Sequence, residues 1–273
     1  MSKPAAPHPA AAPVLLREDR DGIATLTLNR PAARNALSAE LIAALADELT
    51  AIRDDRGVRA VVLAANGPAF CAGHDLKELT ARRADADGGR AFFTKTFELC
   101  AAMMQAIVHL PQPVVAAVNG TASAAGCQLV ASCDLVVASE SAQFATPGVN
   151  IGLFCSAPMV ALSRKVAAGH AMEMLLTGEP ITARRAHEIG LVNRLAASER
   201  VLEEAFALAR TVAGKSAHVQ KIGKEAFYRQ TEMNLADAYA YASRVMAENM
   251  MARDAEEGIG AFVEKRTPNW EDR

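Results

Sequence analysis

Hydrophobic positions along the chain follow two periods, which predict strands alternating with helices. Residues 23–28 alternate in polarity, whereas residues 58–64 and 114–118 are continuously apolar, as strands covered on both faces are. Between the first two runs lies a helical stripe with Ser38 placed as its N-cap, formed by Leu41, Ile42, Leu45, Leu49 and Ile52. Residues 14–18 and 23–28 flank Asp21-Gly22, which predicts a hairpin.

The same plan of strand, small-residue turn and helix recurs in residues 58–79 and 114–130. Repeated units of this kind predict an α/β fold with a largely parallel sheet and helices outside it. A further strand is expected at 135–138. Helical patterns then dominate, at 157–166, 171–176, 182–189, 198–213, 217–228, 234–250 and 254–265.

Composition and charge narrow the class of protein. The chain has 273 residues, of which 51% are hydrophobic, enough for one large domain or a domain with an appendage. A net charge of -2 gives no general attraction for nucleic acid, and no apolar run reaches the roughly 20 residues of a membrane span. We therefore expect neither a nucleic-acid partner nor a membrane span.

The first residues and the cysteines bear on location. Residues 1–13 are rich in Ala and Pro and have neither the apolar core of a signal peptide nor the Arg spacing of a transit peptide, which predicts a disordered tail. The five cysteines are odd in number and have no paired spacing, which favours free buried thiols over a disulfide framework or a metal site and predicts a cytoplasmic protein.

The stretch from Pro113 to Gly152 is the first candidate for chemistry. Its apolar strand is broken at Asn119-Gly120 and followed by small residues up to Gly126. Small side chains on a buried turn let a ligand approach the backbone, and the free N–H groups of a helix that starts there attract negative charge. This is the outline of an anion or oxyanion site. A tightly packed turn without a ligand is the alternative.

Two loops, FCAGHDLKEL from Phe70 and NGTASAAGCQL from Asn119, carry a resemblance. In this order they resemble the crotonase family, also called the enoyl-CoA hydratase/isomerase superfamily, and within it the enoyl-CoA hydratase domain-containing subgroup. The resemblance implies a spiral of ββα units, with an acyl-CoA site in residues 14–200 and a C-terminal helical trimerisation region in 201–273. It also implies a homotrimer or a pair of trimers, lipid or fatty acid substrates carried as coenzyme A thioesters, and no metal or separate cofactor.

The resemblance also implies which residues form the site. The backbone N–H groups of His74 and Ala125 correspond to an oxyanion hole for the thioester, and coenzyme A would lie along Cys71, Ala72, Gly73, Asp75 and Leu76. Arg30, Arg34 and Lys265, the last from a neighbouring subunit, are candidates for its phosphates. For each of these three cations, a solvated surface charge is the alternative.

The chain departs from the family where hydration needs two glutamates. Gln128 and Gly148 occupy those positions, and neither side chain accepts a proton at neutral pH. We therefore expect thioester binding and enolate stabilisation to survive, and hydration to be weak unless both glutamates are restored. His74 is a candidate base, or else a residue that packs beside the loop.

Three functional classes remain open from the sequence. An enzyme of the hydratase or isomerase type is the first, and a catalytically silent acyl-CoA-binding or partner protein is the second. A dinucleotide-binding oxidoreductase is a distant third, since the turn after Val118 lacks the GxGxxG pattern.

Overall fold

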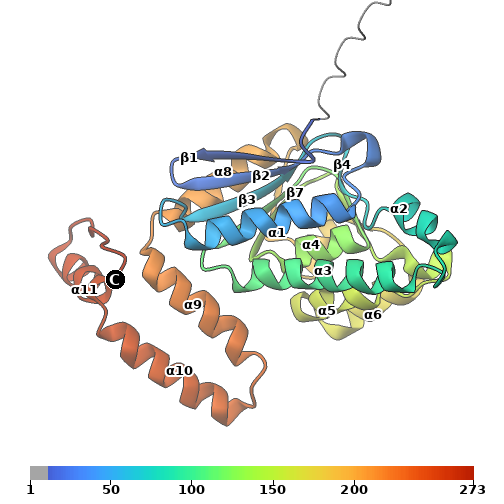
Figure 1. Ribbon diagram of the computed structural model, residues 1–273. Helices are drawn as coiled ribbons and strands as arrows, with labels where there is room; N and C mark the ends of the chain where they lie inside the picture. The colour runs from blue at the N-terminus through green and yellow to red at the C-terminus, as the bar shows by residue number, and fades with distance from the viewer. Residues whose placement is uncertain (1–11) are drawn as a thin grey trace, which may run out of the picture.

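The computed structural model describes residues 12–273 (Figure 1). The tail predicted at residues 1–13 therefore lies outside the described part, except for Ala12 and Pro13. Five of the six strands of the main sheet run parallel, in the order β1-β2-β3-β5-β7-β10, and β1 is antiparallel to β2. A second, four-stranded sheet has the order β4-β6-β8-β9.

Strand lengths differ sharply between the two sheets. The main sheet consists of β1 (Leu15–Arg20), β2 (Ile23–Leu28), β3 (Ala60–Ala65), β5 (Val114–Val118), β7 (Leu135–Ser139) and β10 (Arg194–Ala196). The second sheet consists of β4 (Ala69–Cys71), β6 (Thr121–Ser123), β8 (Gln143–Ala145) and β9 (Ile181–Thr182). The predicted hairpin at Asp21-Gly22 is present between β1 and β2.

The α-helices follow the strands in regular order. They are α1 (Ala39–Asp54), α2 (Leu76–Ala81), α3 (Arg90–His109), α4 (Ala125–Ser132), α5 (Ser156–Lys165), α6 (Ala168–Thr177), α7 (Ala183–Glu188), α8 (Val201–Ala213), α9 (Ala217–Gln230), α10 (Leu235–Met250) and α11 (Arg253–Glu264). Units β3–β4–α2, β5–β6–α4 and β7–β8–α5 each give one strand to each sheet. This arrangement confirms the predicted spiral of ββα units.

Both faces of the main sheet are covered. Val61 and Leu63 of β3 face a core shared with α1 and α3, whereas Ala60 and Val62 face a second core under α8. Alternate residues of β3 therefore enter different cores, which explains why the run shows no polar alternation. The predicted stripe of α1 is buried in full, and Ser38 caps the helix by accepting a hydrogen bond from the Leu41 amide.

Among residues 12–273, α3 is the one helix whose length and composition would suffice to cross a membrane. In the fold, the side of α3 that carries Cys100, Met103, Met104 and Ile107 is buried in the main core. The helix contacts α1 and α4. Packing within the domain accounts for the apolar character of this side of the helix.

Helices α9, α10 and α11 form an arm that extends away from the two sheets (Figure 1). Helix α8 packs on the main sheet, so the arm begins after Gly214, later than the expected boundary at residue 201. Lys224 and Tyr228 of α9 hold the arm to the body by hydrogen bonds to the Asp134 carboxylate, 2.7 and 2.9 Å long. Asp272 returns to the base of the arm and pairs with Arg59 at 2.6 Å.

Candidate active site

The two loops singled out in the sequence lie against each other. The short strands β4 and β6 lie at the beginning of these loops, and they pair in parallel through Cys71 and Ala122. Gly73 has φ +97°, and a Cβ added there would lie 3.0 Å from the Ala124 Cβ and 3.5 Å from the Ala125 nitrogen. The chain therefore needs glycine at position 73 both for its conformation and for this close approach.

The first loop is shaped by bonds to the segment before α1. Leu37 forms an isolated parallel bridge with His74, donating to the Gly73 carbonyl at 2.8 Å and accepting from the Asp75 amide at 3.0 Å. The bridge uses the Gly73 carbonyl and the Asp75 N–H, so the His74 N–H is left over. It donates no hydrogen bond to any group within residues 12–273.

Asp75 is the N-cap of α2. Its carboxylate accepts from the amides of Lys77 and Glu78 and pairs with Arg30 at 2.9 Å. Partial burial opposes the charge, but the hydrogen bonds from Arg30 and the Glu78 amide outweigh it and lower the pKa of Asp75. The Asp75 carboxylate is therefore ionised and already paired within the loop, with Arg30 and with the first amides of α2.

The second loop turns sharply at Ala124. Its φ of 48° and ψ of -116° resemble the first central residue of a type II′ turn, where glycine is usual. Such a conformation costs on the order of 1–3 kcal/mol in a residue with a Cβ. It is held by the Ala124 amide, which donates to the Ala145 carbonyl at 2.9 Å, and by Gly126, whose Cβ would lie 2.1 Å from the Cys71 carbonyl oxygen.

The turn leaves the first amide of α4 unpaired. Ala125 has no positive φ, so alanine is tolerated there, and its N–H donates to no group in the described chain. Two unpaired amides, those of His74 and Ala125, thus belong to loops in van der Waals contact. Backbone donors fixed in this way can stabilise an oxygen on which negative charge develops.

Gln128 lies one turn further along α4. Its side chain is only 5% exposed, and Oε1 has no hydrogen-bond partner among residues 12–273. Helical side chains lean toward the N-terminus of their helix, so Gln128 covers the turn that contains Ala124 and Ala125. The position carries an amide where an acid would be needed to move a proton.

Gly148 lies in the 3₁₀ helix η3 (Pro147–Ile151), and its surroundings leave no room for a side chain. A Cβ would lie 2.9 Å from the Leu153 carbonyl oxygen and 3.0 Å from the Cys155 Sγ. A side chain at this position would require the turn through Cys155 to move.

His74 is held as a neutral ring. It makes an edge-to-face contact with Phe97, with centroids 5.1 Å apart, and Nε2 is buried without a partner in the described chain. Burial lowers the pKa of His74 to about 4. At neutral pH the ring is a weak base, which favours the packing alternative for this side chain.

The candidate phosphate ligands are not equally placed. Arg30 is engaged with Asp75 and the Ala36 carbonyl, whereas Arg34 is exposed and its carbonyl accepts from the Ala72 amide at 3.0 Å. Arg34 therefore starts beside the loop in which Cys71 is buried and Leu76 is exposed. Lys265 follows α11 as its C-cap, at the opposite end of the molecule from α2 (Figure 1), so it does not reach the candidate site of its own chain.

Two residues near the site, Phe97 and Thr146, carried no signal in the sequence for this role. Phe97 contacts His74, and Thr146 is fully buried with an Oγ1 that has no partner in the described chain. Cys155 fills the space at Gly148. All five cysteines are buried and free, as predicted. Burial raises the pKa of the Cys71 and Cys127 thiols to about 12, which opposes thiolate chemistry in this region.

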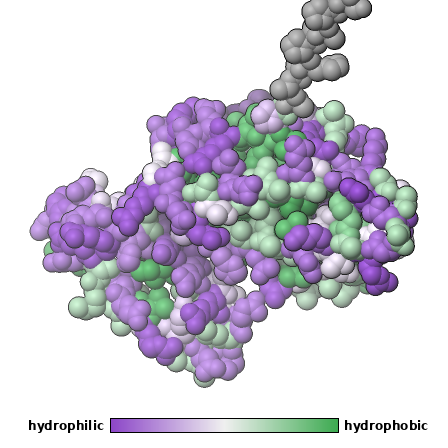
Figure 2. Space-filling view, in the orientation of Figure 1, coloured by the Kyte–Doolittle hydropathy of each residue, from purple (hydrophilic) through white to green (hydrophobic). Residues whose placement is uncertain are grey.

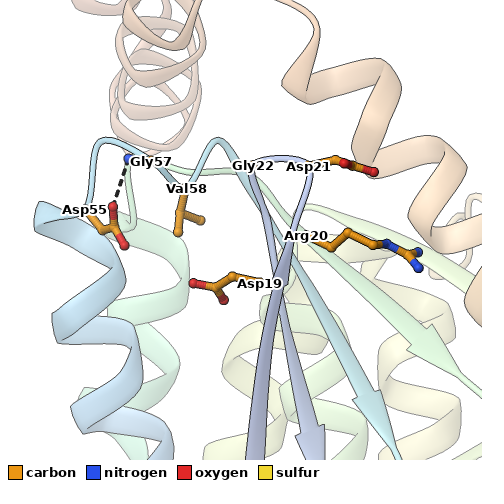
Figure 3. A pocket seen from close by; sticks show the side chains of 7 residues that line it. All are labelled: Asp19, Arg20, Asp21, Gly22, Asp55, Gly57 and Val58. Carbon is orange, nitrogen blue, oxygen red and sulfur yellow. Dashed lines mark hydrogen bonds between the residues drawn. The ribbon is translucent and has the colours of Figure 1, made fainter.

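The cavity in Figure 3 lies elsewhere. It has a volume of about 240 Å³ and is lined by the β1–β2 hairpin, including Asp19 and Asp21, and by the loop from Asp55 to Val58. These residues precede β2 and β3, whereas the candidate site follows the opposite ends of the strands. Asp19 and Asp55 both bind Arg17, so this cavity is a structural feature of the hairpin.

Fold and site together define a class: an α/β spiral of ββα units in which two loops with unpaired backbone amides meet. Comparison with known proteins agrees. The family model described as "Enoyl-CoA hydratase/isomerase" matches residues 18–273. The chain belongs to this family.

Individual relatives and solved structures show which members of the family the chain resembles. The rat "Enoyl-CoA hydratase domain-containing protein 3, mitochondrial" is 45% identical over 92% of this chain and 82% of the relative. A crystal structure of an enoyl-CoA hydratase from Mycobacterium smegmatis is 50% identical, covers 94% of this chain and 99% of that chain, and has a TM-score of 0.89. The structure of the human domain-containing protein 3 is 43% identical, covers 94% and 100%, and also has a TM-score of 0.89. The predicted likeness to this subgroup is confirmed.

The names of the relatives contradict the predicted cytoplasmic location. Five vertebrate relatives, 44–45% identical, are all named mitochondrial. The prediction depended on the unpaired cysteines, which indicate a reducing environment but not which compartment provides it. The cytoplasmic assignment is therefore withdrawn.

The depressed pKa of His74 predicts a pH effect on stability. The folded protein keeps His74 neutral down to about pH 4, while the unfolded chain takes up the proton near its ordinary pKa of 6.5. The unfolding free energy is therefore unaffected by His74 above pH 6.5, and it decreases as the pH falls from 6.5 toward 4. Urea unfolding at pH 7 and pH 5 should show a larger loss of unfolding free energy for the parent than for His74→Leu. Equal losses of unfolding free energy in the parent and in His74→Leu would contradict the lowered pKa of His74.

The closed space at Gly148 predicts that Gly148→Ala destabilises the fold, by about 1–3 kcal/mol as overpacking does. Gly169→Ala in α6 is the matched control, since a Cβ there meets nothing within 4 Å and alanine favours a helix. Thermal unfolding of both variants provides the measurement. If Gly148→Ala is as stable as the parent, the turn through Cys155 can move to admit a Cβ, which would contradict this prediction.

Proposed function

We propose that the chain binds a coenzyme A thioester with its carbonyl oxygen between the amides of His74 and Ala125, and that it stabilises the enolate of that thioester. The observation that supports this most directly is the contact of the two loops through Gly73, which brings together two amides without partners in the described chain. Loss of one such donor typically costs about 10²–10³ in rate.

Proton transfer at this site is expected to be poor. Gln128 and Gly148 offer no acid, and His74 has a pKa of about 4. The nearby carboxylates are already engaged, Asp75 with Arg30 and Glu78 with the Ala39 amide at 3.0 Å. Since general acid–base assistance is worth roughly 10²–10⁴ in rate, hydration of an enoyl thioester should be slow.

The neutral character of the site also favours a second function, that of a silent acyl-CoA-binding protein. Calorimetry with butyryl-CoA and a turnover assay with crotonyl-CoA distinguish the two. The enzyme proposal expects binding with measurable but slow hydration. Binding with no turnover of any enoyl or 3-oxoacyl thioester would leave the silent function, and no binding at all would defeat both.

Restoring one carboxylate tests the role of the amide pair. Gln128→Glu keeps the shape of the side chain and needs no space at Gly148, so hydration of crotonyl-CoA should rise about 10- to 100-fold, a part of the usual acid–base contribution. Gln105→Glu on the exposed side of α3 is the control and should leave the rate unchanged. If a folded Gln128→Glu protein hydrates crotonyl-CoA no faster than the parent, the thioester does not bind beside Gln128 and the proposal is contradicted.

We further propose that copies of the chain cover the arm and form a trimer or a pair of trimers. Hydrophobic side chains come to the surface of the arm (Figure 2), including Phe227, Leu235, Tyr239, Met251 and Phe262. Exposed apolar surface of this kind usually marks an interface. Lys265, at the end of α11, would then approach the phosphates of a neighbour's ligand.

Sedimentation equilibrium tests the assembly. The parent should sediment at three or six times the chain mass, whereas Leu235→Asp and Phe262→Asp together should shift it toward the monomer. A monomeric parent at micromolar concentration would contradict the proposal.

A further inference from the structure

A cluster of charged side chains joins the arm to the far ends of two helices that begin at the candidate site. Helix α4 begins at Ala125 and ends just before Asp134. Helix α5 begins after Cys155, the residue that fills the space at Gly148, and it ends at Lys165. The two helices contact each other and run from the candidate site to the same cluster.

Lys165 ties the far ends of the two helices together. Its Nζ donates hydrogen bonds to the carbonyls of Cys133 and Asp134, at 2.6 and 3.0 Å. Cys133 is the C-cap of α4, so this cation lies at the negative end of the helix dipole. All eight residues of α4 are buried, and a helix of that length spans about 12 Å. Because packed interiors transmit displacements, a tilt at this end of α4 moves the Ala125 amide at the other.

Asp134 connects this end of α4 to the arm. Its carboxylate accepts hydrogen bonds from Lys224 Nζ and the Tyr228 hydroxyl of α9, at 2.7 and 2.9 Å. It also accepts from the Val114 amide at 2.7 Å, and the Asp134 amide donates to the Val114 carbonyl at 3.0 Å. Asp134 is therefore fixed to the start of β5 and to the arm at the same time.

Lys224 is fully engaged in the cluster. Its side chain is 7% exposed, and besides Asp134 it donates to the carbonyls of Ile107 and Gln112, at 3.0 and 3.2 Å. A buried ion pair often contributes no more to stability than apolar side chains of similar volume. Precise placement of the arm against the end of α4 is the better explanation for the pair of Lys224 with Asp134.

We propose that Asp134, Lys165 and Lys224 are positioning residues for the candidate site, through which the docked arm fixes the direction of α4 and thereby the placement of the Ala125 amide. This inference rests on the proposed function, since it concerns the same pair of amides. The cluster lies at the opposite end of α4 from Ala125, so its residues act through the helix and do not contact the thioester. An arm released from Asp134 leaves α4 free to tilt, and the amides of Ala125 and His74 then no longer converge.

Infrared difference spectroscopy of bound butyryl-CoA, labelled with ¹³C at the thioester carbonyl, tests this directly. Hydrogen bonds from two amides polarise the carbonyl, so in the parent its stretching band should lie at a lower frequency than in the free thioester. In Lys165→Met and in Lys224→Met this shift should be smaller. Lys221→Met, on the same helix as Lys224 but exposed, is the matched control and should keep the parent band.

Rates and affinities provide a second measurement. Hydration of crotonyl-CoA should fall about 10-fold in Lys165→Met and Lys224→Met, a part of the roughly 10²–10³ that loss of an oxyanion donor costs. The dissociation constant of butyryl-CoA should change less, because the full negative charge on the oxygen develops only in the transition state.

The outcomes separate this inference from the proposed function. A Lys165→Met or Lys224→Met protein with a lower melting temperature but the parent band would show that the cluster only stabilises the fold, which overturns the inference and leaves the proposed function intact. If either variant does not fold, Tyr228→Phe removes a single hydroxyl from the cluster, and an unchanged band there overturns the inference as well. If the parent does not bind butyryl-CoA, or binds it without a lowered band, the proposed function fails, and this inference fails with it.

Discussion

The approach of Gly73 to Ala124 and Ala125 is the contact on which the site depends. It joins two loops that are about 50 residues apart in the chain, and it exists because β4 pairs with β6 beneath them. The bridge from Leu37 to His74 fixes one loop, and the fit of Gly126 against the Cys71 carbonyl fixes the other. Side chains would separate the loops at either glycine, so the geometry of the amides is set by the absence of Cβ atoms.

Several local features at the site are energetically unfavourable. Ala124 adopts a conformation that favours glycine, and three buried polar atoms have no partner among residues 12–273, namely His74 Nε2, Gln128 Oε1 and Thr146 Oγ1. Strain and unsatisfied groups of this kind persist where surrounding structure over-determines them, and they cluster at sites that bind a ligand. Two cores, one on each face of the main sheet, provide that surrounding stability.

Long elements were predictable from the sequence, and short ones were not. The stripe of α1 and the apolar run of β3 follow from local periodicity, whereas β4, β6 and β8 are three residues each and exist only through pairing with distant strands. The two amides came from the family resemblance, since a pattern cannot show which loops meet. The partner of Arg30, the closure at Gly148 and the burial of Thr146 depend on tertiary contacts that no local pattern contains.

The central claim is that two main-chain amides hold one carbonyl oxygen without help from a carboxylate. A crystal structure with butyryl-CoA bound tests it most directly. The account predicts that the thioester oxygen lies about 2.7–3.1 Å from both the His74 and the Ala125 nitrogen atoms, with Gln128 over the adjoining carbons. A carbonyl bound away from these amides, or a carboxylate within hydrogen-bond reach of the acyl carbons, would contradict it.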